Sequence, residues 1–94
     1  IADMANAFGV RYVPHVWGSG IGLAAALQLL AVLPHNPPGR RPWEPLLEFD
    51  RSEHPFRQAI MKKPIEHANG VVTIPDGPGL GIEIDRDALE SFKN

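Results

Sequence analysis

The stretch VRYVPHVWGSGIGLAAALQLLAVL, residues Val10–Leu33, organises the chain. It begins with a short run of β-branched and aromatic residues that is typical of a strand, and Pro14 and His15 follow that run. The small residues 18–20 then make a turn, and the apolar segment Ile21–Leu33 has the length of a helix. The order is therefore strand, polar residue, glycine turn and helix. In parallel α/β folds the carboxyl ends of the strands carry the chemistry.

The composition limits the class of protein. The chain has 94 residues, enough for one small domain or a piece of a larger one. Its 9 Lys and Arg residues against 11 Asp and Glu residues make no basic field, so no nucleic-acid partner is expected. There is no cysteine, which excludes disulfides and thiolate chemistry. No signal-peptide pattern opens the chain, and Ile21–Leu33 is shorter than the roughly 20 apolar residues of a membrane span. We expect a cytoplasmic protein with no membrane partner.

Further elements are expected on both sides of the first stretch. Apolar residues at helical spacing predict a helix over residues 1–8 that ends at Gly9. No capping residue precedes it, so it is interpreted as the tail of a helix whose beginning is missing. Pro45–Phe49 is predicted to be a second short strand, reached through the loop 35–42. The two strands and the helix Ile21–Leu33 then form a parallel βαβ unit.

The last part of the chain is predicted to alternate between short elements and turns. They are, in chain order, a helix over 52–61 capped by Ser52, irregular chain over 62–70, a strand over 71–74, the rigid turn 75–81 (PDGPGLG), a strand over 82–84, and a helix over 86–92 capped by Asp85. Phe56, Ala59 and Ile60 are expected on the inner face of the first of these helices.

His15 and Glu48 are the residues that the pattern places best for chemistry. Each lies at the end of a predicted strand, and 33 residues separate them, about the length of one βα repeat. Neighbouring parallel strands lie about 4.8 Å apart, so both side chains can face one cleft as a base beside a carboxyl group, an arrangement suited to proton transfer. In the alternative interpretation, His15 caps its strand through a backbone hydrogen bond and Glu48 is a solvated residue of the rim.

The glycine turn offers a weaker candidate site. Leu23 stands where a dinucleotide-binding fingerprint needs its last glycine, so that motif is rejected. The helix N-terminus at Ser19 and Gly20 could hold a substrate carboxylate through free N–H groups, and Trp17 could wall the same pocket. The alternatives are an ordinary tight turn and a tryptophan that packs under a loop. The other histidines lack a second metal ligand at helical spacing and are expected at the surface: His35, His54 and His67.

Three segments in this order, VPHVWGSGIGLAAALQLLAVLP, PLLEFD and NGVVTIPDGPGLGIEIDRDAL, resemble the C-terminal part of the mandelate racemase and muconate lactonizing enzyme-like proteins of the enolase superfamily. The likeness covers nearly the whole chain and is to proteins of the acid-sugar dehydratase type. It implies an α/β fold, the C-terminal fragment of a (β/α)8 TIM barrel. Residues 1–61 would hold its last two βα units, and residues 62–94 would complete the capping domain.

The resemblance also implies a reaction. His15 matches the histidine that serves the family as general acid/base at the end of the seventh strand. Glu48 matches the glutamate of the eighth strand, whose carboxyl group hydrogen-bonds the substrate carboxylate as it becomes an enediolate. The full-length enzyme would use Mg²⁺, with metal ligands on earlier strands and none in this chain. The expected substrate is a small sugar acid and the expected reaction is dehydration, with racemisation or epimerisation as an alternative.

A barrel takes about 250 residues, and only two of its eight strands are predicted here. We therefore expect the isolated chain to be inactive. A helix that is apolar nearly all round and open strand edges leave hydrophobic surface uncovered, which predicts association with the missing barrel portion or with further copies. The alternative function is a non-catalytic module that self-associates or docks to another chain.

Overall fold

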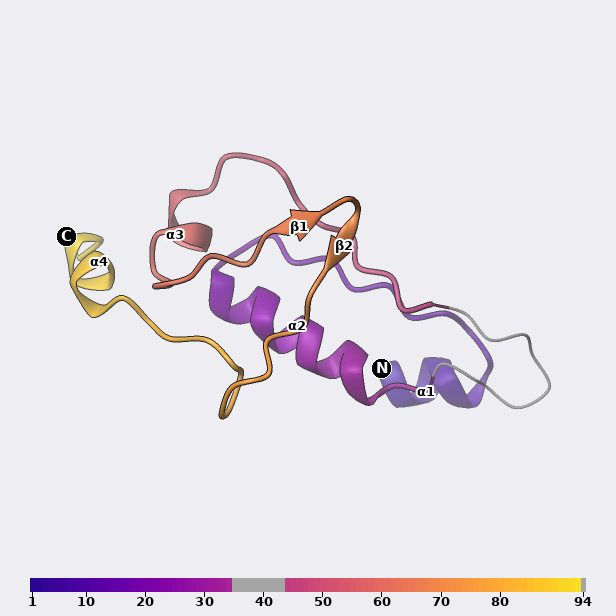
Figure 1. Ribbon diagram of the computed structural model, residues 1–94. Coiled ribbons are helices and arrows are strands. Elements are labelled where there is room, and N and C mark those ends of the chain that lie inside the picture. The colour runs from indigo at the N-terminus through magenta and orange to yellow at the C-terminus, as the bar shows by residue number, and fades with distance from the viewer. Residues whose placement is uncertain (35–43, 94) are drawn as a thin grey trace.

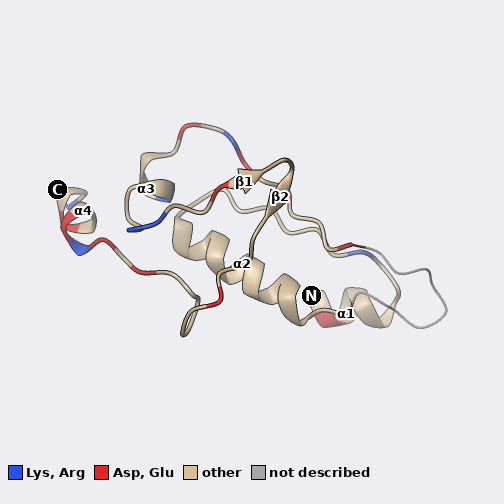
Figure 2. Ribbon diagram, in the orientation of Figure 1, with Lys and Arg blue, Asp and Glu red and all other residues tan. Residues whose placement is uncertain are grey.

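The computed structural model describes residues 1–34 and 44–93 (Figure 1). The helices and strands in those ranges are α1 (Ala2–Ala7), α2 (Gly20–Val32), α3 (Pro55–Gln58), β1 (His67–Ala68), β2 (Val71–Val72) and α4 (Arg86–Ser91). The predicted loop 35–42, with His35, lies outside the described residues. Charged residues occur along the connecting segments, whereas the α2 ribbon carries none (Figure 2). Within the described ranges, no helix is both long and apolar enough to cross a membrane.

The helix predicted over Ile21–Leu33 is confirmed as α2. The hydroxyl oxygen of Ser19 accepts a hydrogen bond from the N–H of Gly22 at 3.4 Å and so caps the first turn. The helix ends at Val32, two residues before Pro34. One side of α2 is buried, while Val32 on another side is 75% exposed. Apolar side chains therefore lie all round α2, but this chain covers only those on one side of the helix.

The predicted N-terminal helix is confirmed as α1, and its ending has a clear cause. Gly9 has φ of 64°, and the N–H groups of Gly9 and Val10 donate to carbonyl oxygens of the last turn at 3.0 and 2.8 Å. This is a Schellman ending, in which a left-handed glycine terminates the helix. The apolar positions that predicted this helix point into solvent rather than into the core: Ile1, Met4 and Phe8.

The strands predicted over 10–13 and 45–49 are wrong as regular strands. The two segments do run side by side (Figure 1), but they are joined by an isolated parallel bridge between His15 and Glu48. In this register the preceding ladder bond would run from the N–H of residue 14 to the carbonyl oxygen of Leu46. Pro14 has no N–H, so the ladder does not extend towards the N-terminus.

A β-hairpin occupies residues 67–72, where irregular chain followed by a strand was predicted. β1 pairs with β2 in antiparallel register, with His67 opposite Val72. Asn69 and Gly70 connect them with φ of 52° and 77°, the left-handed pair that a type I′ turn requires. The predicted strand 71–74 is thus confirmed only at its first two residues.

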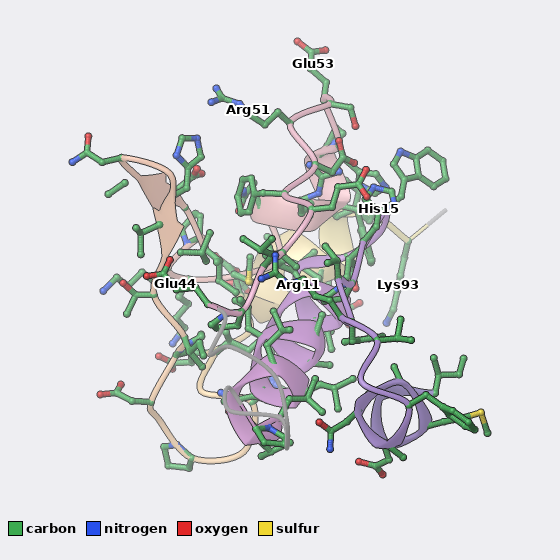
Figure 3. All side chains as sticks on the ribbon, turned by 90° about the vertical axis from the view of Figure 1, so that its right-hand side faces the viewer. Arg11, His15, Glu44, Arg51, Glu53 and Lys93 are labelled. Carbon is green, nitrogen blue, oxygen red and sulfur yellow. The ribbon has the colours of Figure 1, made fainter. Side chains whose placement is uncertain are left out.

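α3 is much shorter than the predicted helix 52–61. Ser52 does not cap it, because its N–H and hydroxyl group both donate to the carboxylate of Asp50, at 2.8 and 3.0 Å. The helix begins instead at Pro55, whose missing N–H suits the first helical position. The side chains of Arg51 and Glu53 project away from this loop (Figure 3). Of the three residues expected on the inner face, the first is buried, the second half-buried and the third exposed: Ile60, Phe56 and Ala59.

The C-terminal predictions are largely confirmed. α4 begins after Asp85, whose carboxylate accepts the N–H of Ala88 at 2.9 Å. The turn 75–81 is tight, with φ of 73° at Gly81. The strand predicted over 82–84 is wrong as a strand, since only its last residue bridges to Met61.

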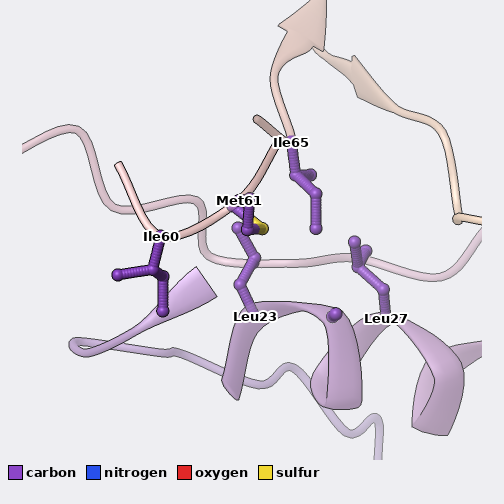
Figure 4. Close-up of a cluster of buried hydrophobic side chains, with 6 residues drawn as sticks. Leu23, Leu27, Ile60, Met61 and Ile65 are labelled. Atoms are coloured by element: carbon purple, nitrogen blue, oxygen red, sulfur yellow. The ribbon is translucent and has the colours of Figure 1, made fainter. Parts of the chain in front are cut away.

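The core packs α2 against residues from the chain after α3 (Figure 4). Its buried members are Leu23, Ala24, Leu27, Ile60, Met61 and Ile65. Half-buried residues from the C-terminal segment pack against it, namely Val72, Ile74, Leu80, Ile82 and Leu89. Residues on both sides of position 61 therefore share one core, and the predicted division there stays a prediction.

Candidate active site

The structure brings together the two residues that the sequence singles out for chemistry. His15 and Glu48 are opposite each other in a parallel bridge, and the N–H of Glu48 donates to the carbonyl oxygen of Pro14 at 3.0 Å. Directly opposed residues of parallel segments place their side chains on the same face. Both side chains are exposed. An imidazole and a carboxyl group on neighbouring segments thus project from the same surface.

Trp17 extends this surface and contacts a histidine that was expected to be solvated. Its side chain is 71% exposed, and its ring meets the ring of His54 edge to face, with centroids 5.7 Å apart. This contact joins the loop after His15 to the loop after Glu48. His54 is half-buried, because the two loops pack together at this contact.

His67, also expected at the surface, takes part in two contacts. This half-buried residue accepts a hydrogen bond at Nε2 from Nη1 of Arg51, at 2.8 Å, and its ring meets that of Phe49 at 5.5 Å. Because a guanidinium only donates, Nε2 must be the unprotonated nitrogen in this arrangement. β1 is thereby fastened to the chain that follows Glu48.

Ser19 and Gly20, the candidate substrate-binding residues of the turn, have structural roles here. The hydroxyl oxygen of Ser19 is used in capping α2. Gly20 is buried, and a Cβ at this position would overlap the carbonyl oxygen of Arg57 and the side chain of Met61. Glycine therefore allows the start of α2 to press against α3. That these two residues contact a substrate stays a prediction.

A buried ion pair beside this surface was missed in the sequence. Arg57 is 5% exposed and pairs with the carboxylate of Asp50, two residues after Glu48. The N–H and hydroxyl donors of Ser52, and then the charge and hydrogen bond of Arg57, hold the pKa of Asp50 below its usual range despite partial burial. The Asp-x-Ser spacing, typical of an Asx turn, is the signal that could have indicated the turn, although not the burial of Arg57.

The sequence model of the family described as "Enolase C-terminal domain-like" matches residues 1–88. The chain belongs to the enolase C-terminal domain-like family. This confirms the resemblance to the C-terminal part of the mandelate racemase and muconate lactonizing enzyme-like proteins, and the family's domain is an α/β domain of the TIM-barrel type.

Curated relatives in this superfamily include cycloisomerases and sugar-acid dehydratases. D-galactarolactone cycloisomerase of Agrobacterium fabrum is 59% identical over 93 residues, which cover 99% of this chain and 25% of that protein. Chloromuconate cycloisomerase of Cupriavidus pinatubonensis is 39% identical, over 98% of this chain and 23% of that protein. Arabinonate dehydratase of Saccharolobus solfataricus is 33% identical, over 99% and 22%. The chain spans about a quarter of the length of these relatives.

Enolase-superfamily proteins generally use Mg²⁺. In the described part of this chain, no three His, Asp or Glu residues are grouped so that they could hold a metal ion. Hard cations of this kind need several oxygen ligands, so these residues do not fit a magnesium site by themselves.

Proposed function

We propose that this chain is the C-terminal part of an enzyme that removes the proton α to a carboxylate of a sugar acid or of a sugar-acid lactone. The observation that carries this proposal is the parallel pairing of His15 with Glu48, which sets a group able to take or give a proton beside a carboxyl group on one exposed face. Relatives named for galactarolactone and arabinonate support the substrate class.

In this proposal the two side chains have separate roles. The carboxyl group of Glu48 hydrogen-bonds the substrate carboxylate as negative charge develops on its oxygens after loss of the α-proton. The imidazole of His15 acts as general acid. It gives its proton to the oxygen that leaves the β-carbon, while the electrons of the broken C–H bond form the new double bond. The base that takes the α-proton belongs to the remainder of the full-length protein.

The identity of the leaving oxygen separates two activities. In an open-chain sugar acid it is a hydroxyl group, which departs as water, and the reaction is the dehydration expected above. In a lactone whose ring oxygen is bonded to the β-carbon of a free carboxylate, the same step opens the ring. The 59% identity to a protein named D-galactarolactone cycloisomerase favours testing lactones beside acids. Return of the proton to the opposite face would make the enzyme a racemase or epimerase.

The remaining expectations belong to the same proposal. Residues 1–61 supply the last two βα units of the barrel, and residues 62–94 complete the capping domain. Magnesium is held by residues outside this chain. Trp17, which is exposed and two residues from His15, contacts the substrate, and the turn at Ser19 and Gly20 lies at the edge of the same pocket.

Association with the rest of the barrel is proposed to cover the apolar side chains that this chain leaves in solvent. The most exposed of them at the N-terminal end are Ile1, 99% exposed, and Phe8, 75% exposed. Exposed apolar patches of this kind mark interaction surfaces. Binding between copies of this chain, the basis of the non-catalytic alternative, would instead give oligomers of the isolated 94-residue chain, which sedimentation can detect.

The test is turnover by the full-length protein on aldonic acids, aldaric acids and the 1,4-lactones of the aldaric acids, with Mg²⁺ present. We expect His15→Asn and Glu48→Gln each to lower kcat by about 10²- to 10⁴-fold on the preferred substrate. Glu66→Gln, at an exposed glutamate after α3, is the matched control and should keep wild-type activity. Undiminished turnover by His15→Asn would remove this histidine from the mechanism.

A further inference from the structure

Arg57 makes all of its recorded side-chain hydrogen bonds to the loop that follows Glu48. Its Nη2 contacts the carboxylate of Asp50, and its Nη1 donates to the backbone carbonyl oxygens of Asp50 and Ser52, at 2.9 and 3.2 Å. The guanidinium is almost fully buried. A planar guanidinium with several fixed donors can hold a carboxylate and two carbonyl groups at once, which an ammonium group cannot do in the same geometry.

These hydrogen bonds of Arg57 matter because the ladder that pairs Glu48 with His15 is only one bridge long. A single bridge relates the two residues, and Pro14 prevents the ladder from continuing towards the N-terminus. The position of Glu48 therefore depends on how the chain after it is held. Arg57 fixes that chain two residues further on, at Asp50.

The backbone of the same arginine contacts the chain that follows His15. Its carbonyl oxygen lies so close to Gly20 that no side chain could be accommodated there. Gly20 begins α2, five residues after His15. One residue thus borders both loops that leave the candidate catalytic surface.

We propose that Arg57 is a positioning residue that holds the carboxyl group of Glu48 in register with His15. The proposal rests on the function proposed above. Arg57 itself does not touch the substrate. Its effect passes through Asp50 and Ser52 to the placement of Glu48.

The experiment compares Arg57→Lys, Glu48→Gln and the double variant in the full-length protein. Arg57→Lys keeps the positive charge but loses the planar guanidinium with its several fixed donors. We expect it to lower kcat by about 10²-fold with little change in KM, because small misplacements of a catalytic group have effects of this size. In the Glu48→Gln background it should cause no further loss, since residues that act through one another are not additive. Lys62→Met, which breaks the exposed pair with Glu83, is the control and should leave kcat unchanged.

Two further measurements keep the test decisive if the lysine variant folds poorly. Asp50→Asn retains a side-chain acceptor but removes the charge partner, and it should show the same non-additivity with Glu48→Gln. The backbone N–H of Glu48 is hydrogen-bonded to the carbonyl oxygen of Pro14, and its hydrogen exchange should be faster in either variant.

The outcomes separate the two proposals. If Glu48→Gln leaves turnover unchanged, the proposed function fails. The proposed function stands if Glu48→Gln lowers kcat. The positioning role is then wrong in either of two cases: Arg57→Lys and Asp50→Asn reduce thermal stability without lowering kcat, or they lower kcat further by an independent factor in the Glu48→Gln background.

Discussion

The side-chain amide of Gln28 donates a hydrogen bond of 2.7 Å to the carbonyl oxygen of Pro75, 47 residues later in the chain. The same nitrogen is 3.3 Å from the carbonyl oxygen of Leu80. Gln28 is the one strongly polar residue of α2, and it holds both ends of the turn between Pro75 and Leu80. The turn is therefore anchored to α2 as well as shaped by its own prolines and glycines.

Replacing Gln28 with Leu should destabilise the full-length protein by roughly 1–3 kcal/mol, because two carbonyl groups lose their donor in a partly buried place. The free energy of unfolding in urea measures this. Leu29→Met, at the more exposed neighbouring position, keeps a similar volume and should change the stability by less than about 1.5 kcal/mol. Equal stabilities of the two variants would show that the turn does not depend on Gln28.

Gly20→Ala tests the close packing of α2 against α3. The new methyl group would overlap the carbonyl oxygen of Arg57 and the side chain of Met61, so we expect a loss of about 1–3 kcal/mol. Gly18→Ala is the matched control, because a Cβ there meets no atom of the described chain within 4 Å. Thermal unfolding of both variants should separate them clearly. A neutral Gly20→Ala variant would contradict the packing described for the start of α2.

Phe8→Ala tests whether the exposed face of α1 is covered in the full-length protein. In this chain the phenyl ring is largely in solvent, where its removal would change stability by no more than about 0.5 kcal/mol. If the rest of the barrel covers it, we expect a loss of about 3–5 kcal/mol. Lys63→Ala, at an exposed position far along the chain, serves as the control. A neutral result for Phe8→Ala would mean that this face stays in water.

The pH dependence of stability should report the Asp50 carboxylate. Its pKa is lower in the folded chain than the ordinary value of 3.8, first through the Ser52 N–H and hydroxyl donors. The folded state therefore gains stability above about pH 4 and loses it as the pH falls through the depressed folded pKa. Unfolding measured from pH 7 down to pH 2 should show the difference in stability between wild type and Asp50→Asn shrinking below pH 4. A difference that stays constant over this range would mean that the carboxylate does not carry the effect.

Local signals were sufficient where an element depends mainly on its own residues. The apolar run Ile21–Leu33 predicted α2, and Asp85 predicted the start of α4. The strand near Pro14 failed for a different reason. Its β-branched residues fit a pleated surface, but a ladder needs a donor at each pairing position, and propensity does not count donors. The hairpin was missed although Asn69-Gly70 is a strong turn signal, because the residues before it lack a clear alternating pattern.

The candidate site also combines features that the sequence predicted with features that it could not predict. The spacing of one βα repeat was enough to predict that His15 and Glu48 would meet, since repeat length sets which strands are neighbours. It could not predict the contact of Trp17 with His54 or the burial of Arg57. Those depend on how two loops and α3 pack after the chain has turned, and no short-range pattern encodes that packing.

The shared core has a consequence for the order of events during synthesis. Ile82 and Leu89 pack on the cluster built around Leu23 and Leu27, yet they are synthesised more than 50 residues later. A nascent chain halted at Met61 would carry α2 with part of its surface bare and prone to aggregation. Native packing of this region must therefore await synthesis of Leu89, and a stop codon before Ile82 would harm solubility as well as chemistry.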